Sequence, residues 1–133
     1  MLTRRSLLGS ATALALVMGA ALPAFADPDA ALAKLAKLKT AYGQVEKKIG
    51  DPTDAANLMG PLNSRDGVQA YLDAVAKAKA SGGTIESGGK ALTERKGNFV
   101  LPALVSGLTN DAEVVQTETF APILYVMKYR DLE

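Results

Sequence analysis

The stretch TETFAPILYV, from Thr117 to Val126, places a single acid directly before a run of apolar residues. The apolar half contains isoleucine, tyrosine and valine, which are enriched in strands, and it predicts a buried strand. Glu118 is therefore expected at the edge of the core. Burying a carboxylate costs several kcal/mol unless it is hydrogen-bonded. We therefore expect water, a neighbouring side chain or a ligand to donate a hydrogen bond to the Glu118 carboxylate.

Two amphipathic helices are predicted upstream of this strand. The first, over 29–44, has its apolar residues spaced 3, 3, 4 and 3 apart on one face: Leu32, Leu35, Leu38, Tyr42 and Val45. The second follows LMGPLNS, with Asn63 as the predicted N-cap and Asp66 three residues later. Its apolar face consists of Val68, Tyr71, Leu72 and Val75, and Gly82 with Gly83 is expected to end it.

Strands are predicted between and after these helices. VEKKIG (45–50) indicates a short strand or an extended link, TIESGG (84–89) a strand that runs into a glycine turn, and FVLPALV (99–105) a strand interrupted by Pro102. Proline suits an edge or a bulge better than a strand centre. Asn110 is a candidate cap for a helical turn through DAEVV, and PILYVMKY closes the pattern as an apolar strand. The alternation of helices and strands predicts an α/β fold.

The pattern also has two gaps. No glycine-rich phosphate loop of the G-x-G-x-x-G or Walker type is present. The apolar strand PILYVMKY lies close to the end of the sequence, so it would lie exposed unless something else covers it. We therefore expect an incomplete sheet from a chain that looks cut short.

Composition excludes several kinds of site. The 133 residues are enough for one domain, and they contain no cysteine and no histidine. A thiolate nucleophile, imidazole catalysis and a cysteine metal site are therefore excluded within this sequence. No metal site and no catalytic residue is predicted.

The first 26 residues have the organisation of an export signal. A basic start with paired Arg4 and Arg5 precedes the uncharged apolar run ATALALVMGAAL, and AFA offers small residues for cleavage after Ala26. The order TRRSLL resembles the twin-arginine signal, with a Sec signal as the alternative. The prediction is an export signal over residues 1–26, a folded domain over 27–133, and a location in the bacterial periplasm.

The charge of the exported part bears on its partners. Removing Arg4 and Arg5 leaves 13 basic and 14 acidic residues, a net charge of −1. This nearly neutral charge does not predict a nucleic-acid partner, because nucleic-acid-binding proteins usually carry an excess of basic residues. A membrane is expected to contact the chain only through the signal peptide.

Six segments together carry a resemblance to a known family. LKTAYGQV, KIGDP, LMGPLNS, AKASGGTIESGGK, GNFVLPALV and TETFAPILYV resemble the aldehyde dehydrogenase superfamily, in this order and at about the family's spacing. The likeness covers residues 35–133. Within the superfamily, Ala121 after TETF, the GNFV turn and APILYV look most like the α-aminoadipic semialdehyde dehydrogenases.

The resemblance implies a role for two residues. In this family the acid of the matching segment binds the hydroxyls of the nicotinamide ribose of NAD, and the following aromatic residue packs beside the nicotinamide. The matching positions are Glu118 and Phe120. A carboxylate can accept hydrogen bonds from both ribose hydroxyls, and charge-assisted hydrogen bonds of this kind are strong. The resemblance thus implies NAD as cofactor and an aldehyde as substrate of the full-length family.

The departures from the family are equally informative. Its chemistry needs a cysteine that adds to the aldehyde before hydride transfer, and this sequence has none. The family's nucleophile, general-base glutamate, oxyanion asparagine and dinucleotide-binding domain lie upstream of the matched region. Its oligomer-building segments lie downstream. We therefore expect a fragment of an NAD-dependent semialdehyde dehydrogenase, inactive alone, with a partial catalytic domain.

Three further positions depart from, or imitate, the family pattern. ESGGK, from Glu86 to Lys90, imitates the family's general-base segment, but it lies where the family has an unrelated glycine turn. Glu86 is therefore predicted to be a strand-end glutamate without a catalytic role. QVEKKIGDP is longer than the family's helix-to-strand link, and Leu101 stands where the subfamily usually carries glutamate.

Two alternative functions follow from other features. An exported, non-catalytic module could bind a partner through its exposed sheet edge. The lysine-rich LAKLAKLK, residues 32–39, has the pattern of a membrane-surface helix, although ordinary core-facing helices have the same pattern and that interpretation is preferred.

Overall fold

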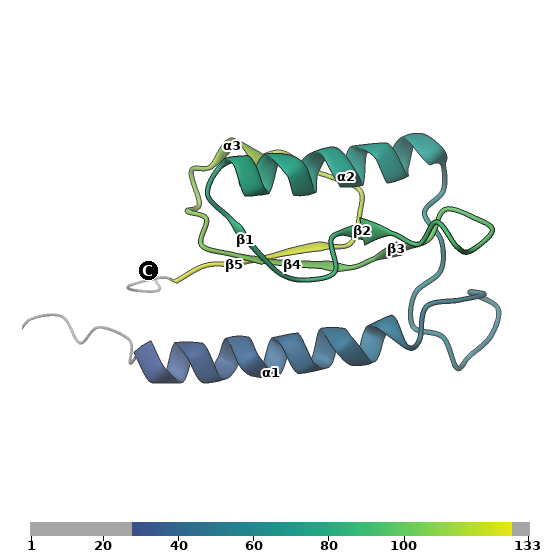
Figure 1. The fold of residues 1–133 in the computed structure, drawn as a ribbon, viewed down its shortest axis with the longest axis horizontal. Helices are drawn as coiled ribbons and strands as arrows, with labels where there is room; N and C mark the ends of the chain where they lie inside the picture. Colours follow the sequence, from purple (N-terminus) through teal and green to yellow (C-terminus); the bar gives the residue numbers. More distant parts are fainter. Residues whose placement is uncertain (1–27, 129–133) are drawn as a thin grey trace, which may run out of the picture.

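The structure is a computed structural model that describes residues 28–128 (Figure 1). The predicted export signal and its cleavage point after Ala26 lie outside these residues. The helices are α1 (Pro28–Glu46), α2 (Arg65–Ala80) and α3 (Glu113–Gln116). The strands are β1 (Thr84–Ser87), β2 (Lys90–Ala91), β3 (Val100–Leu101), β4 (Ala103–Ser106) and β5 (Ile123–Val126). This arrangement is the predicted α/β fold with an incomplete sheet.

Strand β4 is the centre of the larger sheet. It pairs antiparallel with β1 on one side and parallel with β5 on the other, so the order is β1-β4-β5. A separate antiparallel pair joins β2 to β3. Ala103, Leu104 and Val105 of β4 are each at most 1% exposed. Both faces of the central strand are therefore covered.

The two longer helices cover opposite faces of this sheet (Figure 1). The face toward α2 carries the main hydrophobic core, in which Ala103 and Val105 pack with Ile123 and Tyr125 of β5 and with the buried residues of α2. The other face carries Leu104, which alternates with these residues along the strand. Fully burying a leucine or valine side chain contributes about 1.5–3 kcal/mol.

Helix α1 lies against the sheet through one side only. Leu35, Leu38 and Tyr42 are half-buried, whereas Leu32 near its start is 64% exposed. The predicted 29–44 helix is thus confirmed, with an ordinary face toward the sheet. Within residues 28–128, no helix combines the length and apolar character needed to cross a membrane.

Helix α2 begins and ends with capping groups that the sequence places there. The N-cap is Ser64, whose Oγ accepts from the Gly67 amide at 3.0 Å, so the prediction of Asn63 as the cap is wrong by one residue. At the other end the amides of Gly82 and Gly83 donate to the carbonyls of Lys79 and Ala78 at 3.0 and 2.8 Å. Gly82 has a positive φ of 90°, as a Schellman C-cap requires. The predicted glycine cap is confirmed.

Pro102 separates β3 from β4, which confirms the predicted interruption but not an edge position. The chain passes at Pro102 from the small β2–β3 pair into the centre of the larger sheet. Proline is tolerated because it lies between the strands and not within one. Gly88, with a φ of 67°, passes so close that an added Cβ would lie 1.9 Å from the Pro102 carbonyl oxygen. Only glycine fits there.

Two local predictions differ from the structure. Residues 45–50 do not form a strand: α1 continues to Glu46, a turn follows, and Ile49 makes only an isolated bridge to Met59. Asn110 does not cap α3, because the N-cap is Ala112 and it makes no side-chain capping bond. The α3 segment is held instead by burial of Val114.

Tyr71 of α2 links the helix to the sheet region through its hydroxyl. The side chain is fully buried, and its hydroxyl donates to the Leu101 carbonyl of β3. Burial raises the pKa of Tyr71 to about 12. Leu101, which departs from the subfamily pattern, is itself buried, so its side chain belongs to the interior.

We expect Tyr71→Phe to destabilise the fold by about 0.5–1.5 kcal/mol, because it removes one of two hydrogen bonds to the buried Leu101 carbonyl and leaves only the Gly89 amide as a donor. Urea unfolding monitored by circular dichroism measures the effect. Tyr42→Phe on half-buried α1 is the matched control and should change stability by less than about 0.5 kcal/mol. Equal stability of Tyr71→Phe and the unsubstituted chain would contradict this role.

Candidate functional site

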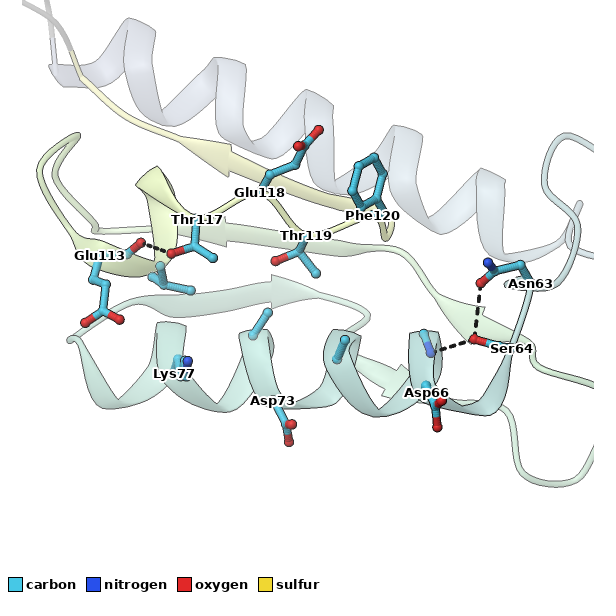
Figure 2. Close-up of a pocket in the computed structure, with 14 residues that line it drawn as sticks. Asn63, Ser64, Asp66, Asp73, Lys77, Glu113, Thr117, Glu118, Thr119 and Phe120 are labelled. Atoms are coloured by element: carbon cyan, nitrogen blue, oxygen red, sulfur yellow. Dashed lines mark hydrogen bonds between the residues drawn. The ribbon is translucent and has the colours of Figure 1, made fainter.

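A groove of about 540 Å³ runs between α2 and the segment from α3 to β5 (Figure 2). Buried Ala74 and Val114 belong to its lining, and most of the remaining side chains are polar and exposed or half-buried. A volume of this size falls within the usual range of small-molecule sites, roughly 300–1,000 Å³. Its lining residues are Asn63, Ser64, Asp66, Gly67, Ala70, Asp73, Ala74, Lys77, Glu113, Val114, Thr117, Glu118, Thr119 and Phe120.

The segment 117–121 forms one side of the groove and is held by short-range hydrogen bonds. At its start, the Thr117 Oγ1 donates to the Glu113 carbonyl at 2.8 Å (Figure 2). At its end, the Ala121 amide donates to the Thr119 carbonyl at 2.6 Å. The Ala103 amide of β4 then donates to the Pro122 carbonyl at 2.9 Å. These bonds tie the segment to α3 and to the central strand.

Glu118 lies on this segment with its side chain exposed, so the expected position at the edge of the core is wrong. The apolar strand that follows begins only at Ile123, so Glu118 lies before the buried strand and outside the interior. Among residues 28–128, no side-chain hydrogen bond or ion pair involves its carboxylate. Both oxygens can therefore accept donors from solvent or from a ligand.

Phe120 lies two residues further on and is 87% exposed. Figure 2 places it on the same segment as Glu118, at the border of the groove. An aromatic side chain this exposed offers a face on which a planar ring can pack. The structure thus brings the two predicted residues, Glu118 and Phe120, to one groove.

The opposite side of the groove comes from α2, whose residues were not among the predicted site residues. Asp66, Ala70, Asp73 and Lys77 are spaced 4, 3 and 4 residues apart and follow one stripe of the helix. This stripe lies beside the apolar face that the periodicity revealed. The missed signal was a second stripe on the same helix, in which Asp66, Asp73 and Lys77 are charged.

Glu86 lies elsewhere, on β1, and both of its carboxylate oxygens are engaged. Oε1 accepts from the Ser106 hydroxyl at 2.6 Å, and Oε2 accepts from the Lys39 ammonium of α1 at 2.9 Å. The Ser106 hydrogen bond, followed by that of Lys39, lowers the pKa of Glu86. This geometry gives Glu86 a structural connection between α1 and the sheet.

No group of three or more acidic side chains converges on a metal-sized site within residues 28–128. The groove presents four carboxylates, one ammonium group and one aromatic ring, which belong to Asp66, Asp73, Glu113, Glu118, Lys77 and Phe120. Such a set can bind an organic ligand that combines hydroxyl donors with a planar ring.

Comparison with known proteins gives a consistent result. The model of the aldehyde dehydrogenase family matches residues 27–133. A Caenorhabditis elegans protein named as a homologue of aldehyde dehydrogenase family 7 member A1 is 56% identical over 99 residues, which are 74% of this chain and 18% of that protein. The α-aminoadipic semialdehyde dehydrogenase of Bos taurus is 48% identical over 95 residues, 71% of this chain and 17% of that protein.

A solved structure has the same fold. The betaine aldehyde dehydrogenase of Staphylococcus aureus, a double mutant in complex with NAD+, superposes with a TM-score of 0.61 and 29% identity. The superposition covers 72% of this chain and 20% of that one. This chain therefore spans about a fifth of the length of the proteins that it matches.

We expect the stability of the chain to fall as the pH drops below the usual glutamate value of 4.5, in part because of Glu86. Its folded-state pKa is lowered, so its contribution is present above the unfolded-state pKa and is lost as the pH falls through the folded-state pKa. Glu86→Gln should cost about 1–3 kcal/mol near neutral pH and flatten this acid limb. Urea unfolding across the acid range measures both effects.

Lys39→Gln, which removes one of the two hydrogen bonds that lower the pKa of Glu86, is the comparison for that experiment. The Lys39 side chain is 47% exposed, so removing its charge should cost less than about 1 kcal/mol. An unchanged acid limb in Glu86→Gln would show that Glu86 makes no such contribution.

Proposed function

Since this chain belongs to the aldehyde dehydrogenase family, we propose that it supplies part of the NAD site of a semialdehyde dehydrogenase and does not oxidise aldehydes by itself. The observation that carries the proposal is the joint exposure of Glu118 and Phe120 on one groove. The printed name of the bovine relative supports a semialdehyde as substrate of the complete enzyme.

The residues of the groove fit the nicotinamide end of NAD. The Glu118 carboxylate, exposed and without a partner among the described side chains, would accept hydrogen bonds from the two ribose hydroxyls. Phe120 offers its exposed ring to the planar nicotinamide. When bound, NAD supplies the acceptor for the hydride that leaves the substrate. The role of this chain is to orient the ribose and the ring.

The residues present do not supply the covalent step. Oxidation of an aldehyde in this family starts with addition of a cysteine sulfur to the carbonyl carbon, which prepares the hydride for transfer. None of the 133 residues is a cysteine, and none is a histidine that could replace it as a nucleophile. Binding without turnover is therefore the expected behaviour of this polypeptide.

The proposal extends to the organisation and location of the chain. Residues 1–26 act as an export signal, and residues 27–133 form the partial catalytic domain in the periplasm. Support comes from the paired Arg4 and Arg5, the uncharged apolar run and the small residues Ala24 and Ala26 before Asp27. An exported non-catalytic interaction module is the alternative, favoured by the sheet edge at β5, which no other described strand pairs.

We expect the purified chain to produce no NADH from NAD and a semialdehyde above the level of a protein-free control, because it has no thiol nucleophile. Absorbance of NADH measures the reaction, with full-length bovine enzyme as the positive control. Turnover that follows the chain through successive purification steps would overturn this proposal.

We expect Glu118→Gln to weaken binding of nicotinamide mononucleotide about tenfold, since it removes a charge-assisted acceptor worth about 1.5–3 kcal/mol. Chemical shift changes in an NMR titration measure the binding, which is weak because the ligand contacts only this part of the site. Glu113→Gln lines the same groove from α3 and is the matched control. Equal weakening by both variants would assign the effect to the overall charge of the groove.

We expect the chain to be recovered from the periplasm of a bacterial host in a form that begins at Asp27. Arg4→Lys combined with Arg5→Lys should block export if the twin-arginine pathway is used, whereas a Sec signal tolerates lysine. Cell fractionation and N-terminal sequencing measure the outcome. An uncleaved cytoplasmic product of the unsubstituted chain would contradict the signal.

A further inference from the structure

The segment from Thr119 to Ile123 contains two consecutive hydrogen-bonded turns. The Ala121 amide donates to the Thr119 carbonyl at 2.6 Å, and the Ile123 amide donates to the Ala121 carbonyl at 2.8 Å. Each hydrogen bond joins residues that lie two positions apart, which is the pattern of a γ-turn. Phe120 is the central residue of the first turn, and Pro122 is the central residue of the second.

Pro122 suits its turn for two reasons. Its ring fixes φ at about −65°, and the central residue of an inverse γ-turn has a φ of about −75°. Proline also has no amide hydrogen, so its carbonyl is its only backbone hydrogen-bonding group. That carbonyl accepts from the Ala103 amide of β4 at 2.9 Å, and Ala103 is fully buried. The second turn is therefore held both by the proline ring and by the central strand.

The first turn presents Phe120 to solvent. The side chain is 87% exposed, although an apolar ring is ordinarily stabilised by burial against other apolar surface. Figure 2 shows Glu118 and Phe120 projecting to the same side of the segment, with Thr119 between them projecting to the other side. The backbone of the segment, and not the packing of these side chains, therefore keeps the two candidate site residues in this arrangement.

Pro122 influences these residues from outside the groove, because it is not among the residues that line it. We propose that Pro122 is a positioning residue for the candidate site. By fixing the second turn, it keeps Glu118 and Phe120 in the orientation that binds the ligand while the chain is still free of ligand. The inference rests on the proposed function and adds that the site is preformed.

The physical basis of this role is conformational entropy. A residue without the proline ring has more φ values open to it, and fixing one of them when a ligand binds costs free energy. A site that is already fixed in the folded chain avoids this cost, so its ligand binds more tightly. Pro122→Ala keeps the carbonyl that pairs with Ala103 and removes the restriction on φ.

The experiment titrates the full chain with nicotinamide mononucleotide and follows binding by NMR chemical shifts. We expect Pro122→Ala to bind the nucleotide about three- to tenfold more weakly than the unsubstituted chain. Pro52→Ala is the matched control, because Pro52 is exposed and lies outside the groove lining. It loosens the unfolded chain in the same way and should leave binding unchanged.

Hydrogen exchange provides a second measurement that needs no ligand. The Ala121 and Ile123 amides should exchange faster in Pro122→Ala than in the unsubstituted chain. The Leu104 amide of buried β4 should change no more in Pro122→Ala than it does in Pro52→Ala. This comparison separates loss of the turn from a general loss of stability, which would speed exchange at all three amides.

The outcomes separate this inference from the proposed function. Absence of nucleotide binding by the unsubstituted chain would overturn the proposed function, and the positioning role with it. Equal binding by Pro122→Ala and Pro52→Ala would overturn the positioning role alone. Unchanged exchange of the Ala121 and Ile123 amides in Pro122→Ala would do the same.

Discussion

Burial of β4 from both faces is the constraint on which the rest of this structure depends. Ala103 and Val105 face the core beneath α2, and Leu104 faces the side covered by α1. A strand covered on both faces needs a helical layer on each side. The two helices that form these layers, α1 and α2, both precede β4 in the sequence. The Tyr71 hydroxyl then joins α2 to the chain just before β4. The Leu101 carbonyl that accepts this bond also accepts from the Gly89 amide at 3.3 Å, so both donors fix the chain at this point.

The position of the candidate site follows from the same strand. Because β5 pairs in register with β4, the segment 117–121 must leave α3 and turn sharply to enter the sheet. The Pro122 carbonyl is bound to the Ala103 amide, so the turn is anchored to the most buried strand of the molecule. Glu118 and Phe120 thus stand exposed on a short segment with fixed ends. A binding residue gains precision when a rigid element holds it in this way.

Glu86 and Glu118 show that the surroundings of a glutamate decide whether its carboxylate is free to bind a ligand. Glu86 lies in a segment that imitates a general-base motif, yet the Ser106 hydroxyl and the Lys39 ammonium occupy its oxygens. Glu118 lies beside an apolar strand and was expected at the core edge, yet it is exposed. The first acid is already satisfied by the protein, whereas the second is available to a ligand.

Local patterns in the sequence were enough to predict the α/β class, the two long helices, the glycine C-cap of α2 and the break at Pro102, because each depends on spacing or on backbone preferences of single residues. The family and the two candidate site residues, Glu118 and Phe120, were predicted from the resemblance. Only the tertiary structure decided that β4 is central, that Ser64 caps α2, and that residues of α2 line the same groove as Glu118. These features depend on contacts between residues far apart in the chain, and no local pattern encodes which distant surfaces meet.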